Sequence, residues 1–459
     1  MHHRRRLGKL GWARAFEPSR GLWASGDPPP RDGNSLEVFI DGAHTFQAMA
    51  EEIRAARSHV HIAGWHLEPD FVLAESPLLT LRELLSEAAR TAQARVLVWS
   101  GVPLPPPFRP RRSEIKFLAE ELSGGRITCA LDRKHRLLHC HHEKILIVDD
   151  RCAFVGGLDF STLGASRLDA REHPFRGSMG WHDTAMRIRG PLVADVAEHF
   201  ALRWREVTGE VLPEATVPDR AGEHTGQILR TIPETVYESI PRGDFRILEA
   251  FVRGLRDARR FIYIENQFLW SSEIVRILAG KLRDPPSDDF RLVVLLPAKP
   301  TTGNDDTLGQ LAVLAEADPG GKRFLACTLY ARDGERMHPV YVHSKTAIID
   351  DRWLMIGSAN LNNHSLFNDT EMSVLTCEET LAEETRLRLW EEHLEMPLDS
   401  LKGRSVVELV DEVWKPVAVE QEERREAGRP LTHRLVQLPQ VSKSTKRLLG
   451  PLQTFLVDG

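Results

Sequence analysis

Apolar residues follow two spacings along the chain and divide it into helical and extended segments. Helical periodicity runs over 46–57 and 247–260, and each run leads into a short apolar stretch that reads as a strand. Further apolar strands are predicted at 95–99 and 291–296, each after a helical segment. Alternating helices and strands predict α/β layering around a mixed sheet in each half of the chain.

The apolar pattern also repeats. A His-x-Lys-(x)4-Asp motif with a following small-residue pair occurs twice at a constant offset of 201. The matched positions are His142 and His343, Lys144 and Lys345, Asp149 and Asp350, Gly157 and Ser358, and Asp159 and Asn360. Upstream, 56–65 resembles 258–267 at an offset of 202. We therefore predict two similar α/β sandwich halves with mixed sheets, related by a pseudo-two-fold axis, with the active site at their interface.

The repeat suggests boundaries. We predict an N-terminal segment over 1–35, a first half over 36–208, a Pro- and Glu-rich linker over 209–225, a second half over 226–400 and a helical and looped tail over 401–459. We expect the tail to pack against or cover the halves, and we assign it no chemistry.

The N-terminal segment places Leu7, Leu10, Trp12 and Phe16 among basic residues. This pattern fits a weak membrane-surface anchor, but a solvated basic N-terminus is favoured. The basic start is not followed by an apolar region, so we predict no signal peptide, and no segment is long and apolar enough to span a membrane. We expect a cytoplasmic protein, with peripheral membrane attachment as the alternative.

Composition narrows the classes of protein. The chain has 459 residues, 42% of them hydrophobic and 27% charged, which is ordinary for a folded globular protein. A net charge of −6 argues against a nucleic-acid partner, which usually needs a basic surface. Five cysteines are odd in number and show no paired framework, which favours a reducing compartment.

The residue types of the motif indicate which chemistry they could perform. Side chains alternate along a strand, so His142 and Lys144 should point the same way, as should His343 and Lys345. Two lysines would neutralise the oxygens of a phosphodiester, one histidine would attack phosphorus, and the other would protonate the leaving oxygen. The small pair at Gly157 and its counterpart Ser358 would let backbone amides approach a ligand.

A nucleophilic histidine needs an acid on its other ring nitrogen to hold one tautomer. Asp183 follows the first motif by 41 residues and Glu371 follows the second by 28. The first half therefore carries a 13-residue insertion, which falls within 161–180 and should form a loop at the mouth of the site.

These residues resemble the phospholipase D superfamily, whose mark is the paired motif with a downstream Gly-Gly or Gly-Ser. Flanking stretches at 181–183, 187–191, 199–204 and 262–267 are similar to the phospholipase D enzymes proper. The resemblance implies that His142 is the nucleophile and His343 the general acid/base; symmetry alone does not decide this order. It also implies that Lys144, Lys345, Asp159 and Asn360 line the phosphate pocket, with Asp183 and Glu371 as orienting acids. Asp149 and Asp350 belong to the catalytic signature, with a structural role at the turn favoured.

The resemblance implies metal-independent chemistry with no cofactor, a phospholipid substrate at a membrane surface, and a monomer, because both half-sites lie in one chain. The cluster His139-Cys140-His141-His142 fits zinc, but the second copy lacks these ligands, so we predict no metal. Trp65 and Trp270 either border a lipid site or lie in the core. The leading function is phospholipase D-type hydrolysis, with transfer to alcohols; the alternatives are a cardiolipin-synthase-like phosphatidyltransferase and a nuclease or other phosphodiesterase.

Overall fold

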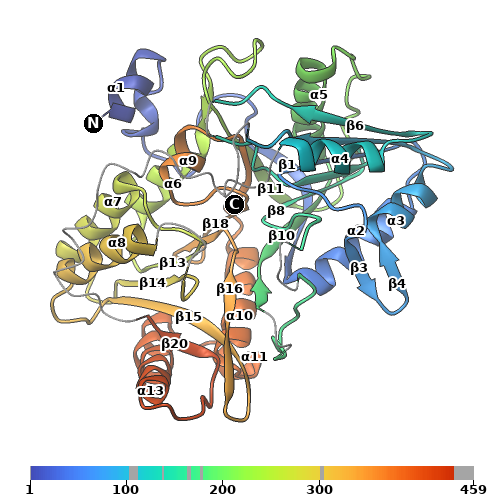
Figure 1. Cartoon of the computed structure of the whole chain (residues 1–459). Coiled ribbons are helices and arrows are strands. Elements are labelled where there is room, and N and C mark those ends of the chain that lie inside the picture. Colours follow the sequence, from blue (N-terminus) through green and yellow to red (C-terminus); the bar gives the residue numbers. More distant parts are fainter. Residues whose placement is uncertain are drawn as a thin grey trace.

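The computed structural model describes residues 2–102, 112–136, 139–162, 167–175, 179–299 and 304–438. Figure 1 shows the first half of the chain on the right and the second half on the left, with strands of both halves meeting at the centre. None of the helices in these ranges is long and apolar enough to cross a bilayer.

The first half is a mixed sheet of seven main strands. β5 pairs in parallel with β2 and β6, and the remaining neighbours are antiparallel. In sheet order the strands are β6 (Ile127–Asp132), β5 (Gln93–Trp99), β2 (His59–Gly64), β7 (Ile145–Val148), β8 (Cys152–Gly156), β10 (Thr184–Arg189) and β1 (Arg31–Ile40). A separate hairpin joins β3 (Val72–Glu75) to β4 (Leu78–Thr80).

The second half repeats this order and these strand directions. β14 pairs in parallel with β13 and β15, and the remaining neighbours are antiparallel. In sheet order the strands are β15 (Phe324–Asp333), β14 (Arg291–Leu295), β13 (Phe261–Glu265), β17 (Thr346–Ile349), β18 (Trp353–Gly357), β19 (Glu371–Thr376) and β11 (His224–Ile232). The short β12 (Asp244–Phe245) pairs with β11. The mixed α/β fold in two similar halves is thus as predicted from the repeat.

The two sheets are also joined to each other. β1 pairs with β11, and β9 (Gly180–His182) pairs in parallel with β16 (Arg336–Val342), which itself pairs with β15. Neither inter-half pairing was predicted. The first-half boundary at residue 36 falls inside β1, and the linker lies between α5 (Val193–Thr208) and the start of β11 at His224.

Helices form layers on both sides of the sheets. One apolar cluster packs the outer face of the first sheet against α2, α3 and α4, and another packs the outer face of the second sheet against α6, α7 and α8. These helices are α2 (Gly42–Arg54), α3 (Leu81–Ala88), α4 (Arg112–Leu122), α6 (Arg246–Asp257), α7 (Ser272–Arg283) and α8 (Asn304–Ala317).

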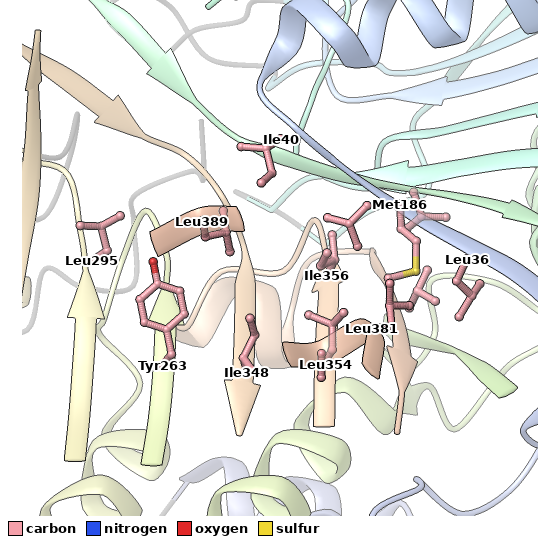
Figure 2. Packing of buried hydrophobic residues seen from close by; sticks show 14 of the residues in the cluster. Leu36, Ile40, Met186, Tyr263, Leu295, Ile348, Leu354, Ile356, Leu381 and Leu389 are labelled. Carbon is pink, nitrogen blue, oxygen red and sulfur yellow. The ribbon is translucent and has the colours of Figure 1, made fainter. Parts of the chain in front are cut away.

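The inner faces of both sheets share a third cluster. It contains Leu36 and Met186 from the first sheet, Leu354 and Ile356 from the second, and apolar residues of α5 and α10 (Glu379–Leu394). Figure 2 shows these side chains packed together, with Leu381 and Leu389 of α10 among them. Because this core belongs to both halves, burial of its apolar surface stabilises their relative placement.

The N-terminal segment differs from both expectations. Leu7 of α1 (His2–Lys9), together with Trp12 and Phe16 beside the short 3-10 turn Ala13–Ala15, is buried in the outer core of the second half. Arg6 donates to Glu234 and to Asn368 Oδ1 at 2.9 and 2.8 Å. The segment is therefore neither a free membrane anchor nor a solvated arm; its apolar side chains are already in the core.

The tail packs as predicted as far as it is described. α11 (Leu398–Leu401), α12 (Val406–Leu409), the π-helical turn Val410–Trp414 and α13 (Lys415–Glu426) cover the central core, and β20 (Leu435–Gln437) adds an edge strand to β15. The remainder of the predicted tail, from residue 439, lies outside the described residues.

Candidate active site

The two motif histidines enter their strands beside the opposite half of the chain. The N–H groups of His142 and Glu143 donate to the carbonyl of Thr370 at 2.8 and 3.2 Å. The N–H groups of His343 and Ser344 donate to the carbonyl of His182 at 2.8 and 3.1 Å. Thr370 and His182 each stand directly before a predicted orienting acid, so the backbone alone aligns each motif with the acid of the other half.

The acids are therefore exchanged between halves. His343 Nδ1 lies 2.6 Å from Asp183 Oδ2, and His142 Nδ1 lies 3.2 Å from Glu371 Oε1. All four groups are buried. The sequence nominated both acids without assigning their partners; the structure pairs each acid with the histidine that is more distant in sequence.

Gly157 and Ser358 differ because their neighbouring acids differ. A Cβ on Gly157 would lie 2.1 Å from Asp183 Oδ1, so the shorter acid rests against bare backbone. Ser358 instead donates its hydroxyl to Glu371, while its carbonyl lies 3.1 Å from His142 Nδ1. Both residues were predicted to bind substrate; in the structure they contact the acids and, at Ser358, the imidazole of His142.

The two lysines have similar backbone contacts and different side-chain neighbours. Lys144 donates to the carbonyl of His142 at 2.6 Å, and Lys345 donates to the carbonyl of His343. Lys144 lies 3.8 Å from Asp159, whereas Lys345 lies 3.4 Å from the amide oxygen of Gln267.

Asp159 and Asn360 occupy the wall beside these lysines. Asp159 accepts from the N–H groups of Trp65 and His66 at 3.1 and 3.0 Å, so two backbone hydrogen bonds account for the position of this acid beside Lys144. Asn360 donates to Gln267 at 3.2 Å, and its own amide oxygen has no hydrogen-bond partner among the described residues. Trp65 is buried near His142, with 6.5 Å between ring centroids, whereas Trp270 is buried against Phe268.

The motif aspartates lie at the other end of the strands. Asp149 accepts from the backbone N–H groups of residues 57–59, and Asp350 does the same for residues 259–261, all within 2.9 Å. Both have positive φ, 54° and 55°, which an aspartate tolerates in a tight turn. These carboxylates cap the starts of β2 and β13, one strand length away from the histidines, and in the described structure they contact the backbone of the turn.

Burial and charge set the protonation states. Burial lowers the pKa of His343 well below its usual value, and the cations Lys345, Arg167 and Lys144 lower it further. Burial raises the pKa of Glu371 to about 8, although Lys144 and two serine hydroxyls oppose it. The pKa of Asp183 is also raised by burial, with Lys345 opposing. Because His343 responds to Lys144 and His142, both half-sites belong to one electrostatic centre.

Several residues of the site carried no role in the sequence interpretation. Ser365 lies within α9 (Asn363–Phe367) and donates to Glu371. It belongs to the segment between motif and acid, which is shorter in this half than in the first. Asp41 accepts from the N–H of Asp183 at 3.1 Å and adopts φ of 64°. The ring of Trp181 lies beside that of His343 in a tilted arrangement, with ring centroids 4.8 Å apart, and Arg167 lies over Trp181. Among these residues, only Trp181 could have been found from the sequence, because it belongs to the Trp-His-Asp stretch at 181–183.

Groups that could hold a metal lie beside the site. The His139–His142 cluster, which was considered for zinc and set aside, is split: His142 faces Glu371, His141 faces Asp132, and His139 joins a three-ligand group with His364 and Asp369. A second group comprises Asp41, His173, His182 and Glu392, all buried. In that group burial opposes protonation, but the carboxylates raise the pKa of His173 to about 9, so ion pairing accounts for its arrangement.

Comparison with known proteins supports the motif assignment. The family described as "Cardiolipin synthase, PLD-like domain" matches residues 255–391. Phospholipase D alpha 4 of Arabidopsis thaliana is 26% identical over 83% of this chain and 70% of that protein. Cardiolipin synthase A of Pseudomonas aeruginosa is 26% identical over 79% of this chain and 67% of that protein. The matched family region contains the second motif, and these relatives are phospholipase D and cardiolipin synthase enzymes, so the chain is similar to members of the phospholipase D superfamily.

Other matches bear on length and fold. Phospholipase D A of Dictyostelium discoideum is 26% identical over 80% of this chain, and the chain spans only 36% of that relative's length. Among solved structures, phosphatidylserine synthase of Haemophilus influenzae matches with a TM-score of 0.54 at 13% identity, covering 86% of this chain and 93% of that one. This likeness concerns the fold.

Proposed function

We propose that the chain cleaves the distal phosphodiester of a glycerophospholipid through a phosphohistidine on His142. One observation carries the proposal: two imidazoles, each held at Nδ1 by a buried acid from the opposite half, share one centre with two lysines. An acceptor oxygen at Nδ1, from Asp183 for His343 and from the carbonyl of Ser358 for His142, leaves Nε2 available for the reaction. Lysines stabilise charge that develops on phosphoryl oxygens.

We assign the nucleophile and the general acid from the different neighbours of His142 and His343. The carbonyl of Ser358 can accept from His142 only when Nδ1 carries a proton, which leaves the lone pair on Nε2 for attack on phosphorus. His343 has a pKa that the surrounding cations lower, and a bound phosphodiester anion would offset them. Substrate binding would thus favour protonation of His343, the state needed to protonate the leaving oxygen.

The reaction then balances in two displacements. His142 Nε2 forms a bond to phosphorus as the phosphorus–oxygen bond to the head group breaks, and the leaving oxygen takes a proton from His343. In the second step His343 takes a proton from water, whose oxygen bonds to phosphorus as the phosphorus–nitrogen bond breaks. The products are phosphatidic acid and the free head group.

Transfer to an alcohol is the second candidate. The matching family and the cardiolipin synthase A relative favour it, because a synthase differs from a hydrolase only in which hydroxyl attacks the intermediate. Either reaction would use a phospholipid at a membrane surface. Because both half-sites lie in one chain, we propose that a monomer is active.

A panel of substrates tests which reaction the chain catalyses. The full chain is incubated in EDTA-containing buffer with phosphatidylcholine vesicles, with and without glycerol or phosphatidylglycerol, and separately with a single-stranded oligonucleotide. Choline release without acceptor supports hydrolysis, and product formed only with acceptor supports transfer. Cleavage of the oligonucleotide alone would contradict a lipid substrate.

Trapping separates the two histidines. A phosphatidyl-enzyme formed from labelled lipid should accumulate in His343→Asn and be missing in His142→Asn, with at least about a thousandfold loss of activity in each. His338→Gln, at a half-buried histidine bonded to the carbonyl of Pro339, is the control and should behave as wild type. Label retained in His142→Asn would place the nucleophile elsewhere.

A further inference from the structure

Arg167 stands out because its guanidinium is buried yet poorly paired. The residue is 4% exposed, and its Nε and Nη1 have no hydrogen-bond partner among the described residues. An unpaired buried cation is strongly unfavourable, so such groups usually meet an anion or a ligand. Burial lowers the pKa of Arg167 to about 10, which leaves it charged at neutral pH.

The guanidinium lies within the catalytic centre. It covers the ring of Trp181 at 3.4 Å from the centroid, and Trp181 in turn lies 4.8 Å from the ring of His343. Asp183 and Asp159 are the carboxylates that most raise its pKa, and Arg167 is among the cations that lower the pKa of His343. It therefore faces both half-sites.

The backbone of this segment is anchored. The carbonyl of Arg167 packs so closely on Gly42 that a Cβ there would lie 1.7 Å from its oxygen. Two residues on, Asp169 accepts from the N–H of Trp181 at 2.9 Å, and its carbonyl accepts from Ala43 at 3.1 Å. The segment of Arg167 is thus held by backbone contacts with the start of α2 and with β9, although it belongs to the stretch that the second half lacks.

The charged groups of the centre indicate the role of Arg167. Lys144, Lys345 and Arg167 are three cations, and the carboxyl groups of Asp183, Asp159 and Glu68 act on Arg167. Lys144 and Lys345 each donate to a backbone carbonyl, whereas Nε and Nη1 of Arg167 have no hydrogen-bond partner among the described residues. A phosphodiester carries one negative charge, and its oxygens would supply the acceptors that these two guanidinium nitrogens lack.

We propose that Arg167 is a third phosphate-binding cation, whose free N–H groups donate to a non-bridging oxygen of the substrate phosphodiester. A guanidinium presents its donors in a planar fork that suits phosphoryl oxygens. This inference rests on the proposed function and extends it: recognition of the phosphate is asymmetric, with a lysine from each repeat and an arginine from the inserted segment of the first.

Phosphate binding by the full chain provides the test. Inorganic phosphate is titrated calorimetrically into wild type, Arg167→Gln, Arg167→Lys and the control Arg323→Gln, whose Nε is also without a partner among the described residues but which pairs with Asp288 away from the site. We expect the Kd for phosphate to rise at least tenfold in Arg167→Gln and about threefold in Arg167→Lys, and to stay within twofold in the control. The KM for lipid should follow the same order.

A purely structural arginine would give another pattern. If Arg167 only supported Trp181, Arg167→Gln would lower the Tm; we expect an unchanged or higher Tm without phosphate, because an unpaired buried charge has been removed. Guanidinium ion added to Arg167→Ala should restore at least part of the activity. A phosphate Kd within twofold of wild type in a folded Arg167→Gln protein overturns the inference. Failure of the proposed function is distinct: wild type itself would then cleave no phospholipid.

Discussion

Gly157 and Ser358 occupy equivalent places in the two repeats, yet the residues are not interchangeable. The bare backbone at Gly157 admits Asp183, which in turn holds His343. We predict that Gly157→Ala displaces Asp183 and lowers kcat at least about a hundredfold, since small misplacements of catalytic groups have effects of that size. Gly280→Ala is the control, because a Cβ there meets nothing within 4 Å. Steady-state kinetics of the two proteins decides; equal kcat values would contradict this role of Gly157.

Glu371 should make stability depend on pH. Its pKa is about 8 in the folded protein against an ordinary value of 4.5, so the folded state holds a proton that the unfolded chain releases between these values. The stabilisation from this proton is complete below about pH 4.5 and is lost as pH rises through about 8. Glu371→Gln lacks the proton exchange, so wild type should lose at least about 3 °C of Tm relative to this variant between pH 5 and 8.

Thermal melts of both proteins across that range provide the measurement. Glu378→Gln, at the half-buried N-cap of α10 where Glu378 accepts from Thr225 N–H, serves as the control and should follow wild type. A constant difference in Tm between wild type and Glu371→Gln at every pH would contradict the raised pKa.

At the scale of elements, strands that are buried on both faces were predictable from sequence. The apolar run 291–296 corresponds to β14, Arg291–Leu295, and the run 95–99 corresponds to the end of β5. β1 was missed because Arg31–Asn34 is polar and is ordered by pairing with β11 rather than by an apolar pattern. β9 has three residues and is a strand only because β16 of the other half pairs with it. Contacts between distant segments leave no local signal.

The position of the N-terminal helix was also not predictable from local sequence. The basic residues around Leu7 favoured a solvated segment or a membrane anchor, whereas Leu7 is buried in the core of the second half. We predict that Leu7→Ala lowers the unfolding free energy by about 2–4 kcal/mol, as for other fully buried leucines, and the Tm by about 2–4 °C. Arg5→Gln, on the exposed face of the same helix, should leave the Tm unchanged. Differential scanning calorimetry measures both. A Tm unaffected by Leu7→Ala, with reduced binding to lipid vesicles, would restore the anchor interpretation.

At the scale of the whole molecule, the repeat predicted a shared centre but not the exchange of acids. Both acids were found because each stands in a similar position after its motif, and spacing along the chain cannot show which histidine each one meets. That assignment depends on the parallel pairing of His182 with Val342 and of Thr370 with His141. Arg167 was missed for a related reason: it has no counterpart in the second half.

Because each acid contacts the histidine of the other half, a change at an acid in one half should affect the histidine in the other. In Asp183→Asn, the imidazole resonances of His343, 160 residues away, should shift, and those of His142 should change much less. The reason is that a neutral amide no longer fixes the tautomer of His343. Nitrogen-15 imidazole NMR follows both rings, with Asp195→Asn, at an acid paired with Arg31, as the control. A larger shift at His142 than at His343 would contradict the crossed pairing.

The shared core also predicts that the linker is dispensable once the protein has folded. Val217 is 53% exposed, and a protease site inserted between 217 and 220 should be cleaved without loss of either fragment, because inner-face residues of both sheets pack in one cluster. Leu7 of the first fragment lies in the core of the second half and links them further. The cleaved protein should elute as one species with at least about half its activity, and fragments separated in denaturant should be inactive alone, because each lacks the acid for its own histidine. Activity in an isolated fragment would show that a half-site works without the other.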